Sequence, residues 1–301
     1  MIVVIVLLAL GMALGRWRAL PEHAAATLDT VVLGVSLPAL ILREVPKLRL
    51  DASALIPLGA VWLQFLLAIL AVYAAARIWG WDRKTLGTLL IVVPLGNTSF
   101  FGLPAVEAVA GRAHLGPALV YDQLGSFIGL TTWASFVAAR YGRHSGGGFR
   151  PALWRMLTFP PFLALVGAMI LRAFELPQGI RISLDEILNR LAETVVPMTM
   201  LAIGIRLKLP RTEGALAPLG FGLGVRLAAL PAILFGIAAV SGLRGTETEA
   251  AVLESAMPSM VTAGIVASGA GLDEELASGL IGIGILIALV TVPGWGWLLG
   301  L

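Results

Sequence analysis

Residues 94–104 read PLGNTSFFGLP and interrupt what would otherwise be one long apolar helix. Pro94 and Pro104 each remove a backbone donor and clash with the preceding turn, and Gly96 and Gly102 loosen the backbone between them. Apolar runs flank the stretch, LLIVV before it and AVEAVA after it. At bilayer depth, non-helical backbone persists only where it is buried in protein or lines a watery cavity. The sequence therefore predicts a broken membrane helix of the kind that holds a transported solute.

The composition is typical of an integral membrane protein, with 58% hydrophobic and 13% charged residues and a mean hydropathy of +0.93. The net charge of +3 lies in short loops, and no aromatic-studded basic face indicates nucleic-acid binding. Without cysteine, disulfide and thiolate chemistry are excluded. His23, His114 and His144 show no metal-ligand spacing, so we expect neither a metal nor a cofactor.

Apolar runs of spanning length, about 20 residues each, recur ten times. We therefore expect an all-α membrane protein with ten transmembrane helices. Their expected ranges are 1–15, 24–42, 54–78, 85–110, 115–139, 151–174, 186–205, 215–240, 248–270 and 276–299. The sixth is expected to contain Pro160 and Pro161. The apolar start without a basic region favours a first membrane helix over a cleaved signal peptide.

The two halves of the chain are similar in pattern. Pro38 and Pro197 occupy like places in helices two and seven, and Pro-Leu-Gly opens helices three and eight. Pro94 and Pro258 interrupt helices four and nine. The offsets between these pairs are 159, 161 and 164 residues, which is nearly constant. Because five spans per copy is an odd number, the second copy enters the membrane the other way up, as an inverted repeat.

The expected repeats are residues 1–140 and 151–301, joined by a basic, glycine-rich cytoplasmic linker at 141–150. With both termini outside the cytoplasm, inner loops carry 12 lysines and arginines and outer loops carry 8. This bias favours that orientation.

Asn97 is the first candidate for contact with a substrate, because its amide can donate to a carboxylate. The half-helix that begins near Gly102 also directs a positive end toward the break, which favours an anion. The alternative is that Asn97 only caps that half-helix. Thr98 and Ser99 are further candidates, although small hydroxyl residues also mediate helix packing in membranes.

The second break offers Ser259 and Thr262 as residues that face the first, but no asparagine adjoins it. Residues expected to form the breaks themselves are Pro94, Gly96, Gly102, Pro104 and Pro258.

Four ionisable residues are expected deep within spans, where charge is costly and usually functional. They are Asp122, Glu193, Arg226 and Glu254. Arg226 either holds an anionic substrate or pairs with Glu254 or Asp122, and the pairing is favoured because a lone buried guanidinium is expensive. Glu254 is a candidate proton carrier, with proton and sodium coupling both left open.

The stretch NTSFFGLP at 97–104, followed by YDQ at 121–123, resembles the central motif of the auxin efflux carrier family of permeases. AMP at 256–258 resembles that family's ninth helix. FPPF at 159–162 and MTMLAIG at 198–204 resemble its sixth and seventh helices. The resemblance covers nearly the whole chain.

This resemblance implies a ten-helix fold like that of bile-acid symporters, often dimeric. Helices one, two, six and seven would form a scaffold, and helices three to five and eight to ten a transport domain that slides against it like an elevator. Plant members export auxin, whereas bacterial members include permeases for small dicarboxylates. Because the chain lacks the long plant-type loop, it resembles a prokaryotic member, expected as a homodimer in the bacterial cytoplasmic membrane.

The leading hypothesis is a secondary-active or facilitative transporter of small organic anions. Alternatives are a channel, a receptor or a membrane enzyme. Against an enzyme, the sequence has no paired catalytic carboxylates, histidine motif, P-loop or nucleophile elbow. A receptor would carry a soluble output domain, and no segment here is long enough to form one. A broken helix also suits a pore, but the repeat favours alternating access.

Overall fold

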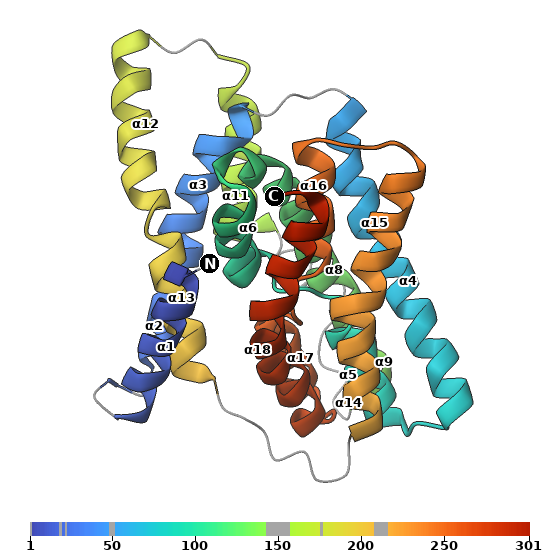
Figure 1. Ribbon diagram of the computed structural model, residues 1–301. Helices are drawn as coiled ribbons and strands as arrows, with labels where there is room; N and C mark the ends of the chain where they lie inside the picture. Colours follow the sequence, from blue (N-terminus) through green and yellow to red (C-terminus); the bar gives the residue numbers. More distant parts are fainter. Residues whose placement is uncertain are drawn as a thin grey trace.

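The computed structural model describes residues 2–17, 20–21, 23–47, 52–142, 157–174, 177–207 and 216–301. All the regular elements of this described part are helical, and its strand-type pairing is one isolated bridge between Gly96 and Ser259 (Figure 1). The predicted all-α class is confirmed. Most of the expected linker lies outside the described residues.

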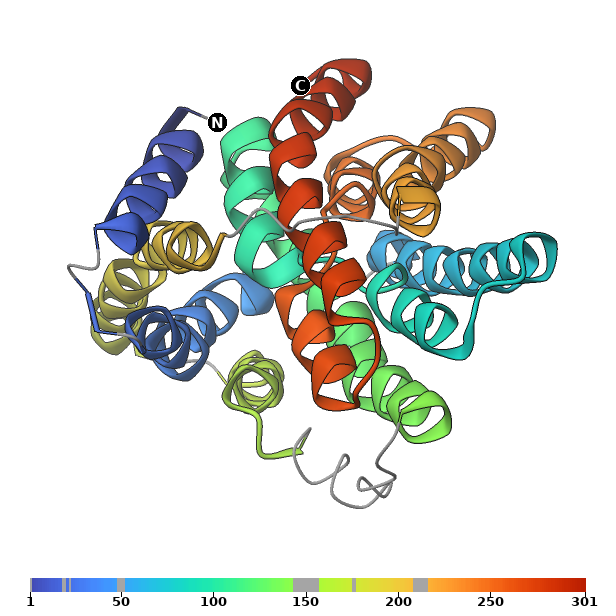
Figure 2. The same ribbon diagram turned by 90° about the horizontal axis from the view of Figure 1, so that it is seen from below.

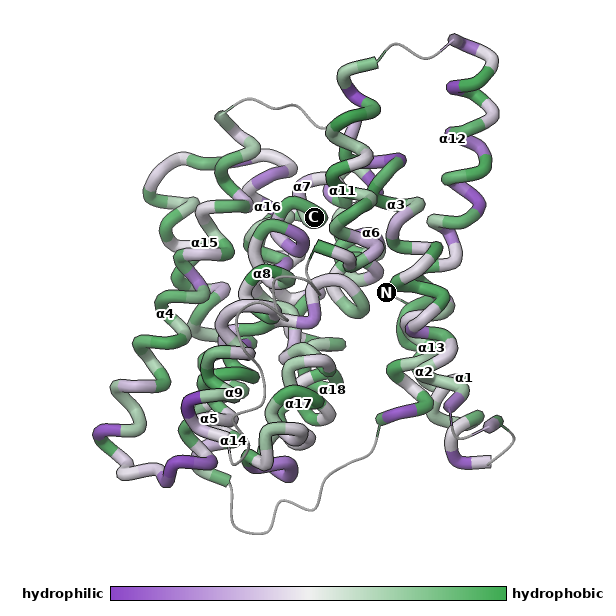
Figure 3. The backbone as a smooth tube through the Cα atoms, turned by 180° about the vertical axis from the view of Figure 1, so that it is seen from behind, coloured by the Kyte–Doolittle hydropathy of each residue, from purple (hydrophilic) through white to green (hydrophobic). Residues whose placement is uncertain are grey.

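Four helical segments of the described chain are long and apolar enough to cross a membrane. They are α2–η1–α3–η2 at Ala24–Lys47, η3–α4 at Ala52–Trp79, α14–η8–α15 at Leu216–Val240 and α18 at Glu274–Leu299. Large apolar side chains such as Leu66, Leu70 and Val290 stand exposed on them. Such faces are stable in lipid and unfavourable in water. Figure 3 shows hydrophobic backbone along these helices and hydrophilic residues near their ends.

Two further apolar stretches are broken, as the sequence predicts. The first consists of α5 (Arg83–Val92), η4 (Thr98–Gly102) and α6 (Leu103–Ala110), and the second of α16 (Thr246–Ser255) and α17 (Val261–Gly269). Pro94 and Pro258 lie in the two gaps. Each proline withholds an N–H and its ring displaces a carbonyl of the preceding turn, so regular helix ends there.

The remaining elements complete the bundle. They are α1 (Ile2–Arg16), η5 (Arg112–His114), α7 (Leu115–Tyr121), η6 (Asp122–Ser126), α8 (Phe127–Gly129), η7 (Leu130–Ala134), α9 (Ser135–Tyr141), α11 (Pro160–Leu171), α12 (Gln178–Ala192) and α13 (Val195–Arg206). Pro160 and Pro161 are the first two residues of α11 and do not lie in a helix interior. Proline is favoured there because the first turn needs no N–H from it.

The seventh predicted helix, 186–205, is different in the structure. Helix α12 begins at Gln178, eight residues earlier, and bends into α13 at Glu193 and Thr194. Sequence hydropathy missed its start because α12 is amphipathic, with charged residues between its apolar ones. Asp185 of α12 forms ion pairs with Arg43 of α3 (3.5 Å) and Lys47 of η2 (3.4 Å). Figure 1 shows α12 extending beyond the neighbouring helices.

Helices α1 and α13 pack closely enough that only glycine fits between them. A Cβ atom on Gly11 would lie 2.6 Å from the Leu201 carbonyl oxygen, and one on Gly204 would overlap the Leu8 carbonyl. Figure 2 shows α1, α2–α3 and α13 on one side of the molecule, and α4, α5, α14 and α15 on the other.

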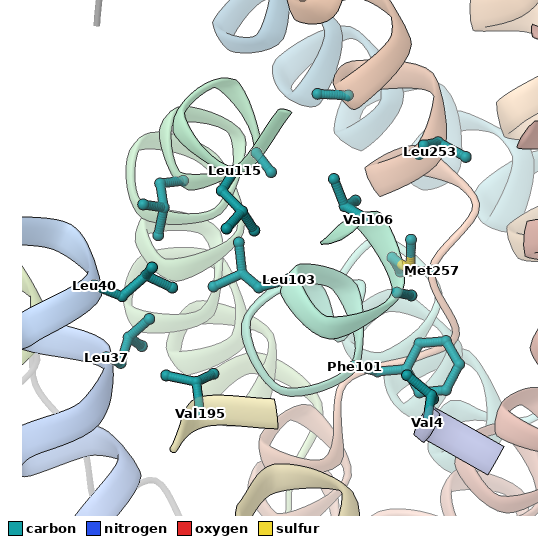
Figure 4. Packing of buried hydrophobic residues seen from close by; sticks show 14 of the residues in the cluster. Val4, Leu37, Leu40, Phe101, Leu103, Val106, Leu115, Val195, Leu253 and Met257 are labelled. Carbon is teal, nitrogen blue, oxygen red and sulfur yellow. The ribbon is translucent and has the colours of Figure 1, made fainter. Parts of the chain in front are cut away.

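Helix α6 lies in the buried core where the two sides meet. Its Leu103 and Val106 share one apolar cluster with Leu37 of α3, Val195 of α13 and Leu253 of α16 (Figure 4). Apolar burial is non-directional, so this packing stabilises the position of α6 without requiring specific hydrogen bonds. The core therefore supports the end of the broken helix where the polar residues begin.

Candidate functional site

The two breaks cross and pair through their backbones. The Asn97 N–H donates to the Pro258 carbonyl oxygen (2.7 Å), and the Met260 N–H donates to the Leu95 carbonyl oxygen (2.9 Å). Gly96 and Ser259 form the antiparallel bridge between them. Backbone groups left over by each interrupted helix are thus satisfied by the other, which is required where water is absent.

Arg226 fastens both breaks from η8 (Val225–Ala229), and its side chain is 1% exposed. Its Nε donates to the Met257 carbonyl oxygen (2.8 Å) and its Nη1 to the Pro94 carbonyl oxygen (3.4 Å). A Cβ atom on Gly96 would overlap the guanidinium, so the glycine makes room for it. Arginine, with five donors, can serve several carbonyls at once.

The expected ion pair of Arg226 with Glu254 or Asp122 is not found. Among the described residues, Arg226 forms no salt bridge. The reason is that the prolines free carbonyl oxygens beside the guanidinium, and these accept its hydrogen bonds.

A cavity of about 750 Å³ adjoins the crossing. Asn97 and Phe100 of the first break line it, together with Met260, Val261 and Thr262 at the second. Other polar or charged residues on its wall are Asp29, Arg206, Ser268, Glu274 and Ser278. The cavity therefore lies between α2 and α13 on one side and α17 and α18 on the other.

Asn97 is 1% exposed, and within the described chain its Nδ2 has no hydrogen-bond partner. Its side chain makes no capping hydrogen bond. The Asn97 backbone carbonyl instead accepts from the Gly102 N–H (2.8 Å). The geometry thus does not favour the capping alternative, because the amide donor remains available at the cavity wall.

The start of α17 also faces the cavity. Val261 and Thr262 are its first two residues, and the preceding Met260 provides no side-chain cap. The first backbone N–H groups of a helix lack helical partners and carry a partial positive charge. The cavity wall therefore presents neutral donors suited to an anion.

Thr98 and Ser99 lie elsewhere than on the cavity wall. Both hydroxyls donate to the buried Asp122 carboxylate, Ser99 Oγ at 2.6 Å and 2.7 Å, and Gln123 Nε2 donates to it at 2.6 Å. Ser259 is buried and is likewise absent from the wall. Of the hydroxyl residues predicted to bind substrate, Thr262 is the one on the cavity wall.

Glu254 and Glu193, both predicted to be deep, have opposite environments. Glu254 is 0% exposed, and neither carboxylate oxygen has a hydrogen-bond partner among the described residues. For Glu193 the predicted deep position is wrong. Its half-exposed side chain accepts a hydrogen bond from Asn189 Nδ2 (3.0 Å) and lies 3.5 Å from Arg112 Nη2. It lies at the α12–α13 bend and not inside a span, because α12 begins earlier than hydropathy indicated.

The sequence reasoning missed the ion pair of Asp29 and Arg206 on the cavity wall. Asp29 was detectable, since it is an acidic residue inside the apolar run 24–42 and such residues are usually functional. It also missed Gln64, which accepts from the Tyr121 hydroxyl and donates to the Ser255 carbonyl oxygen (3.5 Å). Gln64 therefore links α4 to both halves of the bundle.

Comparison with known proteins agrees with this architecture. A family model described as membrane transport protein matches residues 1–144 and 150–296. A protein of Methanothermobacter thermautotrophicus, named as an uncharacterised transporter, is 30% identical, over 97% of this chain and 95% of its own. An uncharacterised transporter of Methanocaldococcus jannaschii is 25% identical, over 99% of this chain and 97% of its own. The prediction that the protein is a transporter and not an enzyme is confirmed. The chain belongs to the membrane transport protein family, that of the auxin efflux carriers.

Proposed function

We propose that the protein is a secondary transporter of small organic anions, carboxylates in particular, and that they bind in the cavity beside the crossing. The observation that carries the proposal is the unpartnered Asn97 amide at the cavity wall. A carboxylate would accept from this amide and from the backbone N–H groups at the start of α17. The Asn97 amide and the backbone N–H groups carry no formal charge. Hydrogen bonds from such donors to an ionised carboxylate are nevertheless stronger than hydrogen bonds between two neutral groups.

The cavity volume of about 750 Å³ suits a small ligand. Its one described arginine, Arg206, is engaged by Asp29. A dicarboxylate can therefore be held at its inner end by amide and backbone donors without displacing this partly exposed ion pair.

The proposal includes an elevator mechanism with ten spans in two inverted repeats, residues 1–140 and 151–301. The scaffold comprises α1–α3 and α11–α13, which are also the proposed homodimer contact, and the transport domain comprises α4–α9 and α14–α18. The rigid pairing of the breaks supports this division, because Arg226 and the backbone bridge would carry both breaks together.

The proposed orientation places both termini outside the cytoplasm of a prokaryotic cell. Arg206 and Glu274, near the inner ends of their helices, then lie on the cavity wall, which supports an inward-open state. At the opposite end, Arg112 contacts Glu107 of α6 (2.8 Å) and Glu193 of the scaffold (3.5 Å). An ion pair across the two domains there supports a closed outer side and alternating access rather than a pore.

A flux assay tests the proposal. Protein in liposomes loaded with unlabelled malate is expected to exchange it for labelled malate from outside. A parallel thermal-shift screen of mono-, di- and tricarboxylates identifies the preferred anion, because a ligand that binds the folded state raises the unfolding temperature. Absence of both flux and thermal shift for every carboxylate would overturn the proposed substrate class.

A channel predicts a different result in the same vesicles. Exchange through a carrier saturates with malate concentration and is accelerated by unlabelled malate on the opposite side. Flux through a pore shows no such acceleration. That measurement therefore separates the two transport classes without any assumption about the coupling ion.

A further inference from the structure

Glu254 lies in α16, one helical turn before the second break, and is fully buried. Neither carboxylate oxygen has a hydrogen-bond donor among the described residues. Gly102 of the first break lies against the carboxylate, since a Cβ atom on Gly102 would lie 3.0 Å from Glu254 Oε1. A buried carboxylate without a donor or a counterion is strongly unfavourable, so this side chain needs a bound positive species.

We propose that Glu254 is a proton-binding site that couples proton movement to anion movement. The inference rests on the proposed function, since it supplies the coupling ion of that transporter. It goes beyond the anion site, because Glu254 is not on the cavity wall.

The two other buried charges already have their partners. Asp122 accepts from Thr98, Ser99 and Gln123, which is the environment of an ionised carboxylate. Arg226 donates to the carbonyls of both breaks. Arg226 Nη2 has no hydrogen-bond partner among the described residues. The negative charge of Asp122 and the positive charge of Arg226 nevertheless balance, so the buried core is neutral only when Glu254 carries a proton.

A proton fits this site better than a metal cation. Hard cations require several oxygen ligands in direct contact. Within the described part of the chain, no hydroxyl or amide is hydrogen-bonded to Glu254, and no cluster of three metal-ligating side chains occurs. The hydroxyls nearest in sequence to the first break are committed to Asp122.

The surroundings of Glu254 contain few other titrating groups. Asp122, Arg226 and Tyr121 act on it electrostatically. Elements packed against α16 also carry His114, which is hydrogen-bonded to Glu249 (2.7 Å), and Glu107, which is paired with Arg112 (2.8 Å). His114 and Glu107 thus each have a side-chain partner, whereas neither carboxylate oxygen of Glu254 has a hydrogen-bond partner among the described residues.

Coupling follows from charge and from one contact. Gly102 adjoins Glu254 and donates its N–H to the carbonyl oxygen of Asn97. An ionised Glu254 would repel an anion bound beside Asn97, whereas a protonated one would not. By thermodynamic reciprocity, a bound anion favours the protonated form equally. A neutral core also crosses the low-dielectric membrane more easily than a charged one, so proton and anion move in the same direction.

The first test is infrared spectroscopy of the purified protein and needs no substrate. The spectrum of wild type minus Glu254→Gln at neutral pH is expected to show the carbonyl band of a protonated carboxylic acid, shifted in D₂O. A band of an ionised carboxylate in its place would overturn the proposal. Glu247→Gln, on the same helix and partly exposed, is the matched control, and the spectrum of wild type minus Glu247→Gln is expected to show no acid band.

The second test uses malate uptake into liposomes with an imposed pH gradient. Wild type and Glu247→Gln are expected to accumulate malate on the alkaline side, and Glu254→Gln to lose that accumulation and the pH dependence of exchange. Accumulation by Glu254→Gln equal to wild type, or accumulation driven by a sodium gradient alone, overturns the coupling. Failure of the proposed function is distinct: wild type then exchanges no carboxylate under any gradient, while the infrared test still reports on Glu254.

Discussion

The two broken helices share a backbone plan and differ in their side chains. Helices α5 and α16 are ten residues each, a proline follows each, and each break gives one carbonyl oxygen to Arg226. The first break, however, exposes Asn97 to the cavity, whereas the second places Glu254 in the core. Both breaks must find hydrogen-bond partners for their freed backbone groups. Under the proposed function, binding of the anion needs a polar side chain from only one of them.

The starts of the two helices differ in the same way. Asp82 caps α5 by accepting from the Thr85 N–H (2.8 Å). Helix α16 starts after Gly245, at a φ of 102° and without a side-chain cap, and has Glu247 and Glu249 in its first turn. Acidic residues there stabilise the helix dipole but satisfy no specific N–H. The first broken helix is thus held at both ends by specific hydrogen bonds.

The largest expected effect comes from removing the residue common to both breaks. Arg226→Leu leaves the Pro94 and Met257 carbonyl oxygens buried without donors, and we expect a loss of about 3–5 kcal/mol of unfolding free energy. Thermal unfolding in detergent measures it. Arg244→Leu, an exposed arginine, serves as the control, and an equal effect of the two changes would contradict the role of Arg226.

The next effect distinguishes the two breaks by function. Asn97→Ala should reduce malate exchange by about 10- to 100-fold, the loss expected for one hydrogen bond to a charged ligand. Its unfolding temperature should hardly change, because Asn97 Nδ2 has no hydrogen-bond partner in the described part of the chain. Ser259→Ala, in the other break, should leave exchange within about twofold of wild type, since a buried serine off the cavity wall contacts no substrate. Equal losses in both variants would remove the difference between the breaks.

A smaller effect is expected from crowding the crossing. Gly96→Ala places a methyl group against the Arg226 guanidinium, and we expect a cost of about 1–3 kcal/mol in unfolding free energy. Gly220→Ala, where a Cβ atom meets open space in a helix, is the control and should be neutral or stabilising. Chemical unfolding of both variants in the same detergent separates crowding from helix propensity.

The smallest effect concerns the helix cap. Asp82→Ala should cost about 1 kcal/mol, the usual value of an N-cap. Hydrogen bonds from Thr85 hold the pKa of Asp82 below its usual value, so the ionised form stabilises the folded state. This contribution is complete above the pKa of an unfolded aspartate, about 3.9, and is lost as pH falls through the lower folded value. Wild type and variant should therefore converge in stability in acid, and a difference that persists there would contradict the cap.

The sequence predicted the breaks and their meeting because proline acts locally. Pro94 and Pro258 each withhold a backbone donor at their own position, and a similar pattern in both halves indicated that the gaps meet. The partners of Arg226 were not predictable in this way, since they are backbone carbonyls freed by those same prolines at remote positions in the chain. No pattern of side chains in the sequence indicates which backbone carbonyls will accept from Arg226.

Side-chain direction in the first break was also beyond sequence reasoning. Asn97, Thr98 and Ser99 were candidates together, but the π-helical turn that begins at Thr98 points its hydroxyl and that of Ser99 to Asp122. A π turn changes the angular offset between successive residues, and its presence is not encoded by hydropathy. Asn97 alone of the three was therefore left at the cavity.

The backbone bridge between Gly96 and Ser259 has a consequence for how such proteins diversify. Main-chain hydrogen bonds depend little on the side chains of the cavity wall, so substitutions on α17 and α18 would leave the crossing in place. New solutes can be accommodated by exchanging wall residues such as Ser268 or Ser278, without rebuilding the frame that carries them. Selectivity and mechanical integrity are thereby separable under mutation.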